Sequence, residues 1–143
     1  MKMKEVSIVI MAVILLFTAI YDGKRKEIPG IFVILMTLVS VMSQAFVIKS
    51  GIADCLCGAA IGILFVGLAI LSKEQMGIGD GLMIAAIGIG VGLRRVLWMV
   101  SIASVIMAAV VIILLLMKKI KKEATIPFLP FLFGGYLLCY LFL

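Results

Sequence analysis

The chain has 143 residues, of which 66% are apolar and only 14% are charged, and its mean hydropathy is +1.39. This balance excludes an ordinary soluble domain and predicts that lipid surrounds the outer surface. The net charge of +6 comes from 13 Lys and Arg against 7 Asp and Glu, and the basic residues stand in short clusters between apolar runs. Such clusters are typical of membrane topology signals, and they form no basic face for nucleic acid.

Six apolar segments predict an all-α membrane protein, a polytopic bundle of about six transmembrane helices in one integral-membrane domain over residues 1–143, with no soluble domain. A helix needs about 20 residues to cross the hydrocarbon core, with about 17 as the lower end. The second, third, fifth and sixth segments meet this length, whereas the first is slightly short and the fourth is short and rich in glycine, which suits a helix packed inside a bundle. The segments are Val6–Tyr21, Ile31–Ile48, Ile52–Leu71, Ile78–Leu93, Val96–Met117 and Ile126–Leu143.

Two aspartates stand on the rims of these segments. Asp22 ends the first segment, and Asp80 opens the fourth, in Gly77-Ile78-Gly79-Asp80. A carboxylate at a membrane boundary is costly unless it has a partner or a task. We therefore take Asp22 and Asp80 as candidate functional residues.

The basic residues predict the orientation of the bundle. With the N-terminus outside, the cytoplasmic loops hold eight basic residues and the outer loops hold five, whereas the reverse orientation inverts these numbers. Asp22 and Asp80 then share the cytoplasmic face, and Asp54 lies on the opposite face. The eight are Lys24, Arg25, Lys26, Lys73, Lys118, Lys119, Lys121 and Lys122.

Two carboxyl groups that meet on one face can hydrolyse a peptide bond. The ionised group removes a proton from water, while the protonated group donates to the carbonyl oxygen. A chain without histidine has no serine–histidine or cysteine–histidine pair to offer instead. Each aspartate also has a structural alternative, in which Asp80 caps the fourth helix and Asp22 is a polar stop before a turn at Gly23.

The three cysteines predict neither a disulfide framework nor a zinc site. Cys55 and Cys57 open the third segment and Cys139 lies deep in the last one, so they are too few and too scattered for the usual spacings. We expect no metal and no cofactor.

The chain resembles the type IV prepilin peptidases, membrane aspartic proteases of the GxGD type. After Asp22 come a basic stretch and Ile28-Pro29, where the family has Ile-Pro-Asn, and Gly77-Ile78-Gly79-Asp80 matches the second catalytic motif. The sequence Ile126-Pro127-Phe128-Leu129-Pro130-Phe131 resembles the proline-phenylalanine signature that opens the family's last helix. The chain departs from the family at Gly30, where asparagine is usual, and at Gly81-Leu82, where many members have a residue and then lysine.

The resemblance implies a membrane aspartic endopeptidase in which Asp22 and Asp80 form the catalytic dyad. The supporting motif residues would be Gly77, Gly79, Ile28, Pro29, Pro127 and Pro130. The partners would be the lipid bilayer and a prepilin or pilin-like substrate, whose short basic leader is removed at the cytoplasmic face of the cell membrane. The chain resembles the peptidase-only form, so no methyltransferase activity is expected.

Two other functions stay open at this point. In a non-catalytic membrane scaffold or a small transporter subunit, the aspartates would carry ions or fix helix packing. The scarcity of other polar residues within the segments argues against a transport pathway. In a presenilin-like protease, cleavage would fall within a substrate helix. The Ile-Pro and Pro-Phe motifs favour the prepilin type by resemblance alone.

Overall fold

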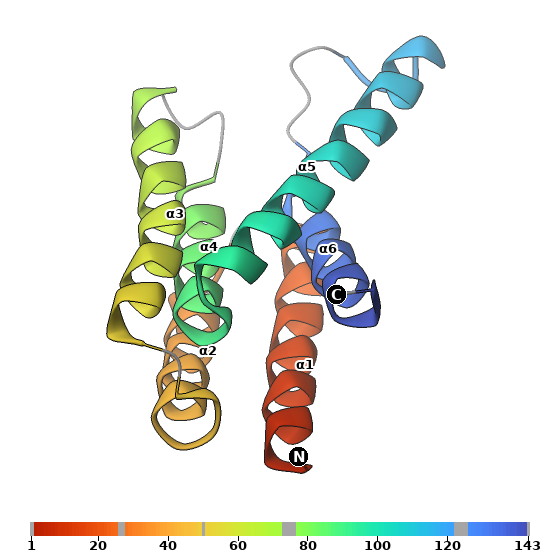
Figure 1. Cartoon of the computed structure of the whole chain (residues 1–143). Helices are drawn as coiled ribbons and strands as arrows, with labels where there is room; N and C mark the ends of the chain where they lie inside the picture. Colours follow the sequence, from red (N-terminus) through yellow and green to blue (C-terminus); the bar gives the residue numbers. More distant parts are fainter. Residues whose placement is uncertain (1, 26–27, 50, 73–76, 122–125, 143) are drawn as a thin grey trace.

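The computed structural model describes residues 2–25, 28–49, 51–72, 77–121 and 126–142, and these residues form a bundle of six α-helices (Figure 1). The predicted all-α class is confirmed, since the described residues contain no strand. The elements are α1 (Lys2–Arg25), α2 (Gly30–Ser43), the π-helical turn η1 (Gln44–Ile48), α3 (Ile52–Leu71), α4 (Ile78–Val91), α5 (Leu93–Leu116) and α6 (Leu129–Phe142).

The first four helices run alternately up and down the bundle, so α1 ends at the side where α4 begins (Figure 1). Helix α5 leans outward from the others, and its C-terminal half projects beyond them (Figure 1). This path places the ends that carry Asp22 and Asp80 on one side of the bundle, and the α4–α5 turn on the other.

In the part of the chain that the structure describes, three helices are long and apolar enough to cross a membrane, namely α1, α3 and α5. The expectation that the first segment is slightly short is wrong, because α1 has 24 residues and continues through the polar residues at both of its ends. The sixth segment is shorter than expected, since α6 has 14 residues. The second segment is helical over its predicted length, because α2 continues directly into η1. Proline explains the late start of α6: Pro127 disfavours helix at Ile126, and Pro130 is tolerated only in a first turn.

The tightest helix pair is α3 with α4, and glycine makes the close approach feasible. A Cβ at Gly62 would overlap the backbone of Ala85, and a Cβ at Gly58 would overlap the carbonyl group of Gly88. Small residues at such a contact let two backbones touch within a membrane. As expected from its glycines, α4 is the helix whose residues are buried most evenly around its circumference.

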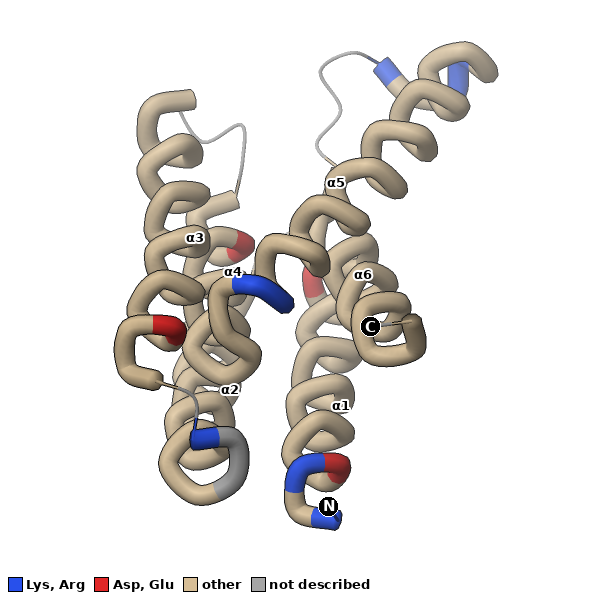
Figure 2. The backbone as a smooth tube through the Cα atoms, viewed as in Figure 1, with Lys and Arg blue, Asp and Glu red and all other residues tan. Residues whose placement is uncertain are grey.

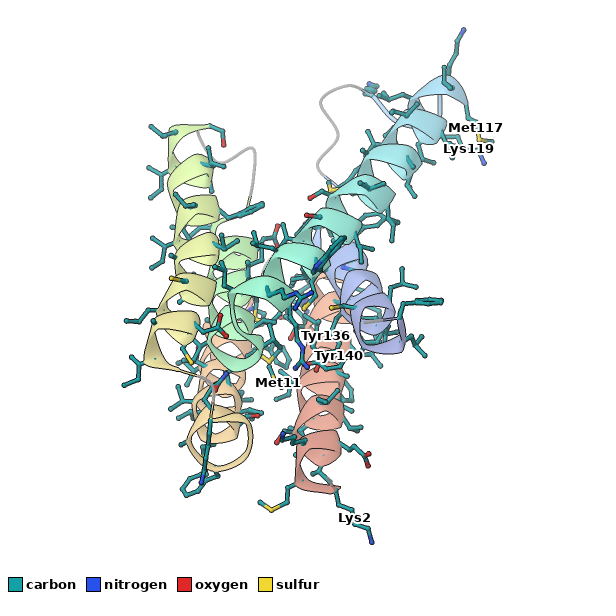
Figure 3. All side chains as sticks on the ribbon, viewed as in Figure 1. Lys2, Met11, Met117, Lys119, Tyr136 and Tyr140 are labelled. Carbon is teal, nitrogen blue, oxygen red and sulfur yellow. The ribbon has the colours of Figure 1, made fainter. Side chains whose placement is uncertain are left out.

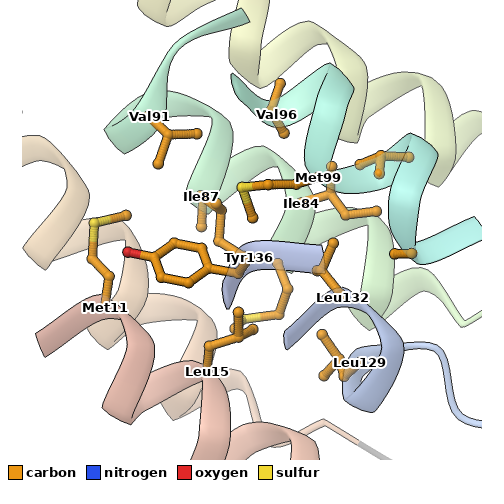
Figure 4. Packing of buried hydrophobic residues seen from close by; sticks show 14 of the residues in the cluster. Met11, Leu15, Ile84, Ile87, Val91, Val96, Met99, Leu129, Leu132 and Tyr136 are labelled. Carbon is orange, nitrogen blue, oxygen red and sulfur yellow. The ribbon is translucent and has the colours of Figure 1, made fainter. Parts of the chain in front are cut away.

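The core lies where α1, α4, α5 and α6 meet (Figure 4). Met11, Ile87, Met99 and Tyr136 come from these four helices in turn, and each is at most 1% exposed. The outward faces of the bundle carry large apolar side chains instead of polar ones (Figure 3). A surface of this kind is stable in lipid and unstable in water, which agrees with a membrane protein.

Candidate active site

Asp22 lies inside helix α1, one turn before its end, and is almost completely buried. Its side chain is 5% exposed, and the helix continues through Gly23 to Arg25. The alternative in which Asp22 is a stop before a turn at Gly23 is therefore wrong. The backbone N–H of Leu129, the first residue of α6, donates a hydrogen bond to the Asp22 carboxylate. The Oδ2 atom of Asp22 has no hydrogen-bond partner among the described residues.

Asp80 lies in the first turn of α4, but it is not the capping residue. The N-cap is Gly77, and the N–H of Asp80 donates to the Gly77 carbonyl at 3.1 Å. The Asp80 carboxylate folds back over this glycine, since a Cβ at position 77 would lie 3.1 Å from Oδ2 of Asp80. A negative charge in this turn is stabilised by the positive end of the helix dipole. Asp80 thus lies at the N-terminal end of α4 without forming a side-chain cap.

The structure brings the two aspartates together at one end of the bundle. They are close enough for the charge of Asp22 to act directly on Asp80. Two neighbouring carboxyl groups favour a state in which one is ionised and the other holds a proton. Such a pair contains a general base and a general acid. That a single water joins the two groups stays a prediction.

The Ile-Pro motif contacts the glycine motif. The side chain of Ile28 packs on Gly79, where a Cβ would lie 2.9 Å from Cδ1 and 3.0 Å from Cβ of Ile28. Pro29 is the N-cap of α2 and holds an extended conformation with φ −61° and ψ 132°. The backbone conformation at Pro29 sets the start of α2, and the Ile28 side chain ties the connection after Asp22 to the turn that carries Asp80.

The start of α6 completes the site from a third direction. Pro130 stands in the first turn of α6, where its missing N–H costs nothing. Phe128 is 7% exposed and its ring stacks on Phe65 of α3, with 6.4 Å between the centroids. These contacts direct the free amide end of α6 at Asp22. The sequence analysis did not identify the N–H of Leu129 as part of the site. The signal in the sequence is Pro130, because a proline marks the first turn of a helix, where backbone N–H groups are free.

A basic cluster was predicted beside Asp22, at the end of α1. Lys24 and Arg25 are exposed in the last turn of α1, and Arg25 lies over the ring of Tyr21 at 5.9 Å from the centroid. Lys26, Lys73 and Lys122 of the predicted cytoplasmic set lie outside the described residues. Within those ranges, no group of three or more His, Cys, Asp or Glu side chains is arranged to hold a metal ion.

Asp54 belongs to the opposite end of the bundle. Its Oδ1 atom accepts a hydrogen bond of 3.1 Å from the N–H of Leu93, the first residue of α5. Gly92, in the α4–α5 turn, has φ +82°, and a Cβ there would overlap the Asp54 carboxylate. Leu93 follows Asp80 by 13 positions, most of them in α4, which corresponds to about 20 Å of helix. Asp54 therefore has a structural task of its own.

A known protein family matches most of the chain. The model of the type IV leader peptidase family matches residues 9–113 of the chain. The matched range includes Asp22 and Asp80, and it ends before the start of α6. Neither a search of curated proteins nor a search of solved structures finds a match.

Proposed function

Because the chain belongs to the type IV leader peptidase family, we propose that it is a membrane aspartic endopeptidase whose catalytic groups are Asp22 and Asp80. The observation that supports this most directly is that these two carboxyl groups stand at the same end of an otherwise apolar bundle and interact electrostatically. An isolated buried carboxylate would be costly, and a pair of them would be costlier unless they share a proton.

The two carboxyl groups stand in different surroundings, and this suggests a division of labour. Asp22, beside the N–H of Leu129, would act as the general base that takes a proton from water. Asp80 would hold the proton and give it to the carbonyl oxygen of the peptide bond. When the tetrahedral intermediate collapses, the C–N bond breaks and the amine leaves with the proton that Asp22 received. Asp80 takes back a proton from one hydroxyl group of the intermediate as the new carboxyl group forms, and the dyad returns to its starting state.

The substrate class follows from the family and from the place of the dyad. We take prepilins or pilin-like proteins as substrates, since these carry a short basic leader followed by a long apolar helix. The apolar outer faces of the bundle are suited to lie beside such a helix in lipid. The dyad at the end of α1 would then meet the bond where the leader joins the helix.

The site would face the cytoplasm in a chain that crosses the cell membrane several times. The support is the excess of basic residues at this side, where Lys24, Arg25, Lys118 and Lys119 are exposed. Figure 2 shows that the described Lys and Arg residues gather near helix ends, as this topology requires. Their role would be to anchor these ends at the head groups.

The proposal is tested by incubating the purified chain in lipid micelles with a pilin-like protein that has a basic leader ending in glycine. We expect a single cleavage after that glycine, detected by mass spectrometry of the shortened product. A non-catalytic scaffold or a transporter subunit would leave the substrate intact. A presenilin-like activity would give products cut within the apolar helix.

A further inference from the structure

A cavity of about 190 Å³ lies between the start of α5 and the side of α6. Arg94, Arg95, Trp98 and Cys139 line it. The cavity is smaller than the roughly 300–1,000 Å³ of sites that hold whole drug-sized ligands. It suits a compact polar group attached to a larger molecule that stays outside.

The two arginines are exposed and stand in an unfavourable place for cations. Arg94 and Arg95 belong to the first turn of α5, at the positive end of its dipole, and this turn contains no acidic residue. Among the described residues, no ion pair joins either guanidinium group to a carboxylate. The nearby Asp54 is engaged with the N–H of Leu93. The charges of both arginines are thus available to an external anion.

Arg95 is held in position from the core of the bundle. Its guanidinium carbon lies 5.4 Å from the centroid of the Tyr140 ring, and that ring packs against Tyr136 at 4.8 Å (Figure 3). The Tyr136 hydroxyl donates a hydrogen bond of 2.9 Å to the carbonyl oxygen of Ile8 in α1. A guanidinium group ordered in this way loses less conformational entropy when it binds a ligand.

Trp98 is a residue type that suits the membrane surface. It follows the arginines by one helical turn, is 50% exposed and is the single tryptophan of the chain. Tryptophan is enriched where lipid tails meet head groups, and exposed arginines avoid the hydrocarbon core. The residue types around the cavity therefore favour contact with lipid head groups.

We propose that this cavity binds the phosphate group of an anionic phospholipid, with Arg94 and Arg95 as the donors and Trp98 against the upper part of the acyl chains. Guanidinium groups match phosphate oxygens with paired hydrogen bonds. The bound lipid would neutralise the charge at the first turn of α5 and fasten α5 to α6. This inference does not depend on the proposed proteolysis.

Fluorescence of Trp98 tests the proposal, because the chain has no other tryptophan. The purified chain in neutral micelles is titrated with brominated phosphatidylglycerol or brominated phosphatidylcholine, whose bromine atoms quench tryptophan. We expect the anionic lipid to quench at a concentration lower by about tenfold or more, as two arginines near a lipid surface imply. Equal quenching by the two lipids would overturn the proposal.

Variants show whether the two arginines are responsible for the preference for the anionic lipid. Arg94→Gln combined with Arg95→Gln should abolish it, while Lys118→Gln with Lys119→Gln, which removes the same charge from the other end of α5, should retain it. A preference that survives in the arginine variant refutes the site. If that variant does not fold, Arg94→Lys with Arg95→Lys decides, since an unchanged preference without the planar guanidinium groups would also refute it. Displacement of the lipid by millimolar inorganic phosphate would assign the cavity to a soluble anion and overturn its assignment to lipid.

Discussion

Ile28 lies directly on Gly79, so the connection that follows Asp22 rests on the turn that carries Asp80. A Cβ at position 79 would lie 2.9 Å from the end of the Ile28 side chain and 3.0 Å from its Cβ. Atoms rarely approach so closely, and here the root of the side chain is involved as well as its flexible end. The glycine is therefore needed for contact between two segments that lie about 50 residues apart in the chain.

Gly79→Ala should push Ile28 away and separate the segments that hold the two aspartates. Misplacing catalytic groups by about 1 Å can cost roughly a hundredfold in rate, so we expect the rate of leader cleavage to fall at least about tenfold. Single-turnover cleavage in lipid micelles measures the effect. Gly67→Ala is the matched control, since a Cβ there meets no atom within 4 Å. A normal rate in Gly79→Ala would show that this contact does not position the dyad.

Asp22→Asn and Asp80→Asn should each abolish cleavage while leaving the amount of protein in the membrane near normal. Asparagine keeps the size of aspartate and can still accept the N–H of Leu129, but it supplies neither a carboxylate base nor an acidic proton. The measurement is conversion of a co-expressed pilin-like substrate, normalised to the membrane content of each variant.

Asp54→Asn is the control for these variants, because Asp54 lies at the other end of α4 and its amide replacement can still accept from Leu93. It should process substrate at the wild-type rate. Cleavage near that rate by either dyad variant would contradict the proposed chemistry. Loss of both variants from the membrane would point to folding as the cause.

Gly92→Ala should destabilise the protein without a direct effect on the dyad. The backbone at Gly92 has φ +82°, and the added methyl group would overlap the Asp54 carboxylate that caps α5. A strained backbone of this kind costs about 1–3 kcal/mol, and the lost cap adds about 1 kcal/mol. Denaturant unfolding in micelles should show the combined loss, whereas the rate per folded molecule should stay near wild type. Unchanged stability would mean that the turn adapts to a side chain.

The orientation can be measured by cysteine labelling in a variant in which Cys55, Cys57 and Cys139 are replaced by serine. With the N-terminus outside, a cysteine at position 49 should react with a membrane-impermeant reagent added to intact cells. Cysteines at positions 24 and 119 should react only after the membrane is opened, because they lie on the basic, cytoplasmic side. Labelling of position 24 in intact cells would reverse the orientation.

Sequence patterns were sufficient for the helices and for the pair of aspartates, because apolar runs and isolated charges are properties of residue types. They were insufficient for the length of α1, since Asp22, Gly23 and Lys24 look like a loop but continue the helix, with the Asp22 carboxylate buried beside the start of α6. The sequence also did not predict that the Asp54 carboxylate caps α5. This cap depends on the close α3–α4 contact that brings Asp54 to Leu93, a relationship between segments that no local pattern encodes.

The role of the Leu129 N–H could not be predicted from the sequence for a different reason. Every residue except proline has a backbone N–H, so its presence carries no sequence signal. Its contribution can nevertheless be tested by mutation, because Leu129 is the first residue of α6 and proline is favoured at that position. Leu129→Pro should remove the hydrogen bond to Asp22 and leave the helix in place. Leu129→Ala removes the same buried side chain but keeps the N–H.

The comparison of these two variants isolates the backbone donor. Both should lose stability, by about 2–5 kcal/mol for the buried leucine, so cleavage is compared per folded molecule. A hydrogen bond to a charged group contributes about 1.5–3 kcal/mol, which corresponds to at least about a tenfold difference in rate if the bond stabilises the ionised base during water activation. We therefore expect Leu129→Pro to cleave at least about tenfold more slowly than Leu129→Ala. Equal rates would show that Asp22 does not depend on the start of α6 for its chemistry.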